Sequence, residues 1–78
     1  MTGLQIEIEK RRLKKSPSGE KFSITNIYKL LGSNYMTTQR KIENNAFTTT
    51  ESLAIFFSLI EPSQQTFDMY LYLFTEQN

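Results

Sequence analysis

The segment from Tyr35 to Asn44 concentrates side chains that can hydrogen-bond to a nucleic acid. Its polar members are Thr37, Thr38, Gln39, Arg40, Lys41, Glu43 and Asn44. Amide, guanidinium and hydroxyl groups can bond base edges in a major groove, and Lys and Arg can neutralise phosphates. A helix with so little apolar surface gains little from packing, so its polar face either meets a partner or is simply solvated.

Two short helices, expected at residues 24–31 and 35–44, would position these side chains. Ser23 is the expected N-cap of the first helix, because its hydroxyl can accept a hydrogen bond from an unpaired backbone N–H. Gly32 is expected to end that helix, since glycine adopts the left-handed conformation without penalty. Ser33 and Asn34 are expected turn and capping residues for the second helix. The expected inward anchors of the second helix are Tyr35, Met36 and Ile42.

A longer pattern surrounds this pair of helices. Leu30-Leu31-Gly32 is followed by a polar helix that ends in Arg40-Lys41-Ile42-Glu43-Asn44-Asn45, and then by Phe47-Thr48 and Glu51-Ser52-Leu53. Over about residues 23–60 this order resembles the helix-turn-helix of the Cro and repressor proteins of temperate phages and mobile elements. The resemblance implies an all-α, compact bundle of four to five short helices. In that family the third helix enters the DNA major groove, commonly as a dimer on a palindromic operator.

The resemblance also implies which residues would contact double-stranded DNA. The expected base contacts are Asn34, Tyr35, Thr37, Thr38, Gln39 and Arg40. The resemblance also places Lys41 at the DNA. From their positive charge, and not from the resemblance, the other expected phosphate contacts are Lys10, Arg11, Lys14 and Lys29. The basic cluster from Lys10 to Lys15 can equally be a solvated helix face, since a run of basic residues is a weak signal.

Two residues depart from the pattern of this family. Tyr28 stands where a small residue is usual, and Thr38 stands where an apolar residue is usual in the second helix. Together with the modest net charge of +1, they favour an alternative interpretation. In it the chain is an antirepressor-like module that binds another regulatory protein instead of DNA.

The charged residues divide the chain into two halves. Residues 1–41 contain all nine Lys and Arg residues and three Glu, a net charge of +6. Residues 42–78 contain five acidic residues and no basic one, a net charge of −5. This asymmetry suggests that the amino-terminal half faces an anionic partner, unless folding interleaves the two halves.

Composition limits the class of protein further. The 78 residues suit one small domain, near the size at which a single core is marginal. The chain has no cysteine and no histidine, so we expect no disulfide, no metal site, no cofactor and no catalytic residue. There is no membrane-length apolar run and no signal-peptide pattern, so we expect a cytoplasmic protein. Because histidine and cysteine are missing and the carboxylates are scattered, we expect that it is not an enzyme.

The start of the chain is ambiguous. Leu4, Ile6 and Ile8 alternate with polar residues, as in a strand, but Glu7 and Glu9 precede a basic run, which suits a helix. We favour a helix over residues 4–15, because a lone strand would have nothing to pair with. Residues 16–21 contain Pro17 and Gly19 and read as a loop.

Two further helices are expected at residues 49–60 and 63–75. Thr48 and Glu51 match a capping box that opens the first of them. The second, capped by Glu61 or Ser63, is apolar on more than one face, so part of it is expected to pack against another protein molecule. The residues expected at this dimer or partner interface are Met69, Tyr70, Tyr72 and Leu73.

Overall fold

A computed structural model of the chain describes residues 1–14 and 22–77, with the side chains of residues 12–14 excepted. In chain order its elements are α1 (Gly3–Lys14), α3 (Ile24–Leu31), α4 (Tyr35–Asn44), α5 (Thr49–Leu59), the 3-10 helix η1 (Pro62–Gln64) and α6 (Phe67–Phe74). The described residues contain no strand, only an isolated antiparallel bridge between Thr2 and Glu76. The all-α prediction is therefore confirmed. The loop expected at residues 16–21 lies outside the described residues.

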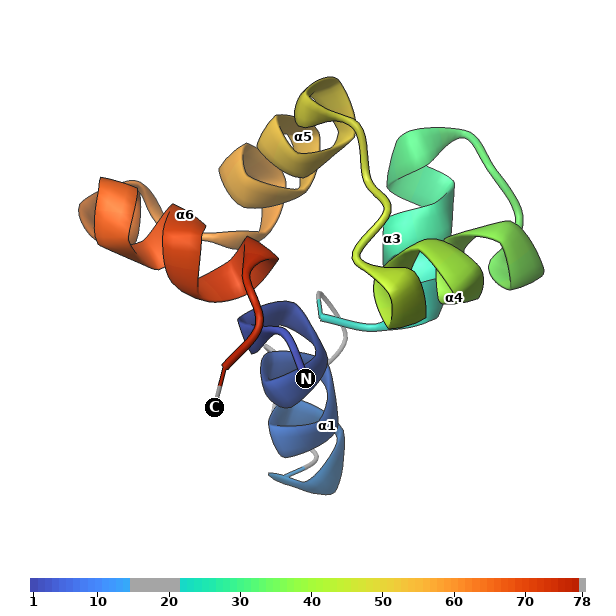
Figure 1. The fold of residues 1–78 in the computed structure, drawn as a ribbon, viewed down its shortest axis with the longest axis horizontal. Coiled ribbons are helices and arrows are strands. Elements are labelled where there is room, and N and C mark those ends of the chain that lie inside the picture. The colour runs from blue at the N-terminus through green and yellow to red at the C-terminus, as the bar shows by residue number, and fades with distance from the viewer. Residues whose placement is uncertain (15–21, 78) are drawn as a thin grey trace.

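The helices are arranged so that α3 and α4 lie on one side of the molecule and α6 on the other (Figure 1). Helix α1 packs against α6 and α4, while α3 packs against α4 and α5. The molecule measures 29 × 28 × 25 Å along its principal axes. Helices α1, α3 and α4 therefore each pack against two other helices.

One hydrophobic cluster holds these helices together. Each helix contributes at least one buried side chain to it: Leu4, Ile27, Ile42, Ile55 and Leu73 come from α1, α3, α4, α5 and α6 in turn. Its other buried members are Phe22, Phe56, Leu59 and Ile60. Phe22 and Ile27 both lie in this cluster, at the spacing that fixes the entry of the chain into α3.

The start of α1 resolves the choice between helix and strand in favour of the helix. Thr2 Oγ1 accepts a hydrogen bond from the Gln5 N–H (3.2 Å), and Gln5 Oε1 accepts one from the Thr2 N–H (2.7 Å). This is a reciprocal capping box, which satisfies donors that the first helical turn leaves unpaired. The T-x-x-Q pattern in the sequence could have located this helix start.

Helix α6 is shorter than predicted from the sequence. It begins at Phe67 rather than at residue 63, and Thr66 is its N-cap, with Oγ1 accepting a hydrogen bond from the Met69 N–H (3.1 Å). Pro62–Gln64 form the separate helix η1 instead. The prediction of a cap at Glu61 or Ser63 is wrong, because Gln65 turns away from the helical conformation and divides the two segments.

The predicted interface on α6 also needs correction. Leu73 is fully buried (0% exposed) and cannot contact another molecule. Met69 and Tyr72 pack against the core, as does Tyr70, whose ring lies 5.5 Å from that of Phe56. The large apolar residues of α6 that face solvent are Phe67 and Leu71. Because α6 packs against α1 and α5, the face of α6 that was predicted to meet a partner is the face that meets the core.

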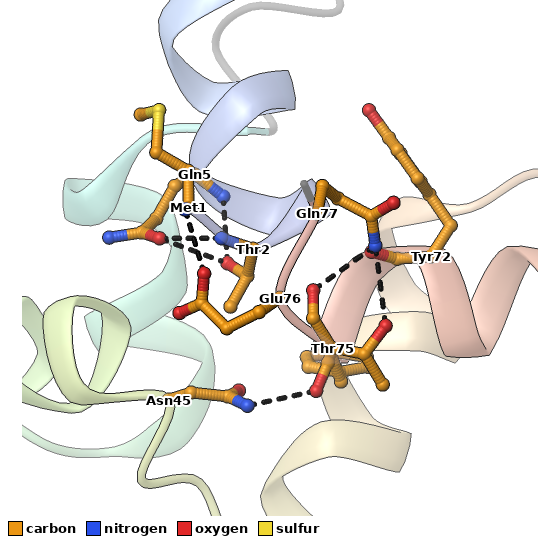
Figure 2. A network of polar contacts seen from close by, with 9 residues as sticks. Met1, Thr2, Gln5, Asn45, Tyr72, Thr75, Glu76 and Gln77 are labelled. Atoms are coloured by element: carbon orange, nitrogen blue, oxygen red, sulfur yellow. Dashed lines mark hydrogen bonds and ion pairs between the residues drawn. The ribbon is translucent and has the colours of Figure 1, made fainter.

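The two ends of the described chain meet beside α6 (Figure 2). Besides the Thr2 to Glu76 bridge, the N-terminal ammonium lies 2.7 Å from Glu76 Oε2, and the Gln77 N–H donates to the carbonyl of Met1 (2.8 Å). The Gln77 side chain donates to the carbonyl of Tyr72 (3.0 Å), which the end of α6 leaves unpaired. These bonds hold α6 to the start of α1.

Helices α1 and α6 approach each other closely at Gly3. A β-carbon at this position would lie 2.1 Å from the carbonyl oxygen of Tyr72, a distance that the backbone cannot tolerate without moving. Only glycine therefore permits this contact between the two helices.

We expect Gly3→Ala to lower the free energy of unfolding by about 2 kcal/mol, because the methyl group must push α6 away. Urea unfolding followed by circular dichroism measures the change. In a helix without such a contact, the same substitution would stabilise the protein by roughly 0.4 to 1 kcal/mol. A stabilised Gly3→Ala variant would therefore contradict the close approach of α1 and α6.

Candidate nucleic-acid interface

Helices α3 and α4 are joined by the three residues Gly32, Ser33 and Asn34. Gly32 has φ 66°, in the left-handed region, and the Ser33 N–H donates to the carbonyl of Tyr28 (3.0 Å). Asn34 then caps α4, with Oδ1 accepting a hydrogen bond from the Thr37 N–H (2.9 Å). Ser23 caps α3 in the same way, through the Asn26 N–H (3.1 Å). The predicted bounds and caps of both helices are confirmed.

The opposite end of α4 is also closed by an asparagine. Asn45 has φ 50°, a left-handed conformation that asparagine tolerates better than most residues. This lets the Ala46 N–H donate to the carbonyl of Lys41 (2.9 Å). The Asn45 side chain donates to the carbonyl of Phe74 (2.9 Å), as Figure 2 shows, so the end of α4 is tied to the end of α6.

Helix α4 is attached to the core by few side chains. Only Thr38 and Ile42 are buried along it, four residues apart and therefore on one face. Ile42 was expected to face inward, and this is confirmed. Met36 was expected to do the same, but it is 62% exposed, because it lies two residues before Thr38 and hence on the far side of the helix. Tyr35, which was also expected to face inward, is 46% exposed.

Tyr28 is accommodated by an aromatic contact across the turn. Its ring and that of Tyr35 lie 6.4 Å apart in an edge-to-face arrangement. Such pairs add to the stability given by burial alone. The bulky residue of α3 is thus used to brace the first turn of α4.

The outer face of α4 presents polar groups to solvent. Thr37, Arg40, Glu43 and Asn44 are exposed, and Gln39 is half-buried. Arg40 and the exposed Lys29 of α3 form no ion pair with any residue that the structure describes. Their charges, together with the amide of Gln39, remain available for an external anion or hydrogen-bond partner.

Thr38 cannot be one of the predicted base contacts. Its side chain is 0% exposed and lies on the core-facing side of α4, the same side as Ile42. Its Oγ1 has no hydrogen-bond partner among the described residues. Thr38 therefore occupies a core position, and its hydroxyl adds only a desolvation cost there.

Lys41 is engaged inside the protein. Its Nζ lies 2.6 Å from Oε2 of Glu51, in the first turn of α5. Glu51 also completes the predicted capping box, since Oε1 accepts from the Thr48 N–H (3.0 Å) and Thr48 Oγ1 accepts from the Glu51 N–H (3.2 Å). The bond from Lys41, followed by the Thr48 backbone bond, lowers the pKa of Glu51 below its ordinary value. The predicted phosphate contact is thus an ion pair that joins α4 to α5.

The basic cluster of α1 is only partly free. Arg11 donates to Glu7 Oε1 (3.2 Å), and its guanidinium carbon lies 4.2 Å from the centre of the Phe22 ring. Glu7 also accepts from the Tyr72 hydroxyl (3.3 Å), and the pKa of Tyr72 is raised first by burial and then by the Glu7 charge. Arg11 thus braces α1 rather than offering a free charge. Lys10 is exposed. The side chain of Lys14 lies outside the described residues.

Two exposed apolar residues border the polar face and were not predicted. Met36 is the second residue of α4, and Leu30, near the end of α3, is 39% exposed. Helical periodicity could have placed Met36 outside, had Thr38 rather than Tyr35 been taken as an inward position. Met36 and Leu30 thus add apolar surface beside the polar face of α4.

Comparison of the chain with protein-family models, curated proteins and solved structures gives no match. No helix in the described part of the chain has the length and apolarity to cross a membrane. The same residues contain no group of three or more side chains placed to hold a metal ion.

We expect Thr38→Val to raise the free energy of unfolding by about 1 kcal/mol, because it replaces an unpaired buried hydroxyl with a methyl group of similar shape. Thermal unfolding should show the melting temperature rising by about 4 to 8 °C. A destabilised variant would mean that the hydroxyl has a partner, and Thr37→Val, at the exposed neighbouring position, is the matched control.

We expect the Lys41 to Glu51 ion pair to make stability depend on pH. Because the pKa of folded Glu51 is lowered, its contribution is present above the ordinary value of 4.5 and is lost as pH falls through the folded value. Glu51→Gln should cost about 1 kcal/mol near neutral pH, and the difference from wild type should disappear in acid. Urea unfolding between neutral and acid pH measures this.

Glu43→Gln is the control, since Glu43 is exposed on α4 and has no ion-pair partner among the described residues. It should unfold like wild type at neutral pH. A pH-independent loss of stability in Glu51→Gln would assign its effect to the shape of the cap alone.

Proposed function

We propose that this chain is a small, sequence-specific DNA-binding regulator of transcription of the Cro or repressor type, acting in the cytoplasm. In this proposal α3, the three-residue turn and α4 form a helix-turn-helix, and α4 enters the major groove. The observation that carries it is the outer face of α4. This face is polar and exposed, the helix is capped by Asn34 and Asn45, and its buried side chains are only Thr38 and Ile42.

The exposed and half-buried polar groups of α3, α4 and Lys10 suit two kinds of DNA contact. Gln39 and Arg40 can each form paired hydrogen bonds with a base edge, as amide and guanidinium groups do with adenine and guanine. Asn34, Tyr35 and Thr37, at the start of α4, are also exposed. Lys29 and Lys10 are exposed lysines that can neutralise phosphates. Lys41 and Arg11 contribute through the fold, since both are paired with carboxylates.

The burial of Thr38 supports the proposal as well. The resemblance to Cro and repressor proteins places an apolar residue midway along the second helix of the motif. Thr38 takes that place and is fully buried. It therefore has the buried position that the pattern requires, although its side chain carries a hydroxyl group. The other residue that departs from the pattern, Tyr28, packs edge-to-face against the Tyr35 ring.

A second function is favoured by the apolar residues beside the polar face. Met36 and Leu30 are exposed next to the turn, and α4 also carries the acidic Glu43. Such a mixture suits a protein surface better than a phosphate backbone. In this alternative the chain is an antirepressor-like module that forms a complex with another regulatory protein.

Binding to duplex DNA at several salt concentrations tests the proposal. The DNA would be the region upstream of the gene for this chain, beside a random duplex and a site selected from a random library. We expect selective binding whose log K falls with log salt at about −0.9 for each phosphate contacted. Equal, weak binding to all DNAs would contradict the proposal, and a stable complex with a second regulator would then support the alternative.

Single substitutions should separate the two kinds of contact. We expect Gln39→Ala to lose about 1 to 3 kcal/mol of discrimination at one base pair. Lys29→Ala should weaken binding to every sequence alike and reduce the salt slope by about 0.9. Fluorescence titration against the selected site and its single-base variants measures both effects.

The matched control is Gln64→Ala, the same change on the exposed helix η1, away from α3 and α4. It should bind like wild type. A Gln39→Ala variant that keeps the wild-type profile at every base pair would remove Gln39 from the proposed contacts.

A further inference from the structure

Met36 is an apolar side chain on the outer, otherwise polar face of α4. It is 62% exposed, whereas Ile42 lies in the core and the Tyr35 ring packs edge-to-face against Tyr28. In Figure 1 the start of α4 lies at the edge of the molecule, away from α1 and α6. Met36 thus offers an apolar group in the very segment that the proposed function places against DNA.

The two buried residues of α4 fix the direction in which Met36 points. Successive residues of an α-helix are about 100° apart around its axis, so Thr38 and Ile42 define the core-facing side. Arg40 lies opposite that side, and Met36 lies within about 40° of Arg40. A helix that meets DNA with its outer face therefore directs Met36 and Arg40 most deeply into the groove.

The place of Met36 along α4 also suits contact with bases. It is the second residue of the helix, and a recognition helix contacts base edges with its N-terminal residues. Glu43 is exposed in the last turn of α4, so the carboxylate lies toward the other end of the helix. A thioether side chain gains little from a phosphate, so the group that Met36 meets must itself be apolar.

One base presents such a group in the major groove. Thymine carries a 5-methyl group there, whereas the other three bases present hydrogen-bond donors and acceptors. Apolar side chains recognise thymine through contact with this methyl group. The unbranched and polarisable side chain of methionine can adjust to its position.

We propose that Met36 is a specificity-determining residue that reads a thymine, by packing its side chain against the 5-methyl group in the major groove. The inference rests on the proposed DNA binding and deepens it, since it names a base that the chain recognises without a hydrogen bond. Met36 then belongs to the DNA contact and not to a surface for a protein partner.

The spacing of Met36 and Arg40 indicates where this thymine lies. Four residues of α-helix advance about 6 Å along the helix axis. Successive base pairs are about 3.4 Å apart. If Arg40 contacts a guanine, as proposed above, the thymine read by Met36 lies within about two base pairs of that guanine.

Replacement of single thymines by deoxyuridine tests the proposal, because it removes the methyl group and keeps every hydrogen-bonding group. The selected duplex would be titrated with each thymine replaced in turn, and Arg40→Ala would identify the guanine. We expect one replacement within about two base pairs of that guanine to weaken binding about fourfold, as loss of a buried methyl group does.

The outcomes separate this inference from the proposed function. Selective binding that tolerates deoxyuridine at every position would overturn the inference alone. Selective binding that is sensitive only at thymines farther from the guanine would overturn it as well. Equal, weak binding to all DNAs would overturn the proposed function and the inference together.

Variants at Met36 assign the methyl contact to this side chain. We expect the effect of deoxyuridine to disappear in Met36→Ala, because the methyl group then has no partner, and to persist in Met36→Leu. Lys29→Ala is the matched control, since it should weaken binding to both duplexes alike and keep the ratio between them. Circular dichroism should show all three variants folded. A Met36→Ala variant that keeps the full effect would overturn the proposal.

A measurement on the wild-type chain does not depend on how the variants fold. The chain has three methionines, whose isotope-labelled methyl groups give separate signals. We expect a nuclear Overhauser signal between the Met36 methyl group and the methyl group of the sensitive thymine. Met69 packs against the core and Met1 pairs with Glu76, so both are internal controls. A Met36 signal that the selected duplex leaves unchanged would overturn the proposal.

Discussion

The fold depends on a single hydrophobic cluster to which all five α-helices of the described chain contribute. Leu4, Ile27, Ile42, Ile55 and Leu73 each anchor one helix in it. In so small a domain no second core can replace a lost contact, so the direction in which each helix faces is set by its anchor. Because Ile42 secures α4, the remainder of that helix is free to be polar. The close approach at Gly3 serves the same cluster, since it brings α6 onto α1.

The charges of the chain serve two different purposes. Lys41 and Arg11 lie in the basic half but are paired with Glu51 and Glu7, where they connect elements of the fold. Arg40 and Lys29 have no such partner among the described residues. The strong asymmetry of charge along the sequence is therefore only partly expressed at the surface. What remains is a small set of free cations on α3 and α4, beside polar groups able to form directed hydrogen bonds.

Two surfaces of contrasting chemistry lie on different parts of the bundle. The α4 face is polar and capped, and it would read its partner through hydrogen bonds and charge. On α5 and α6, the large apolar residues Leu53, Phe57, Phe67 and Leu71 are exposed instead. The Asn45 side chain donates to the carbonyl of Phe74, which links the ends of α4 and α6.

The sequence by itself determined the local features of this protein. The bounds of α3 and α4, the left-handed Gly32, the caps at Ser23 and Asn34 and the box of Thr48 with Glu51 all rest on hydrogen bonds between residues close in the chain. Only the tertiary structure decided which side chains are accessible. It buried Thr38 and Leu73, exposed Met36 and Phe67, and paired Lys41 with Glu51. Apart from Met36, whose spacing from Thr38 places it outside, those outcomes depend on how helices distant in sequence pack together, which residue type and spacing alone do not give.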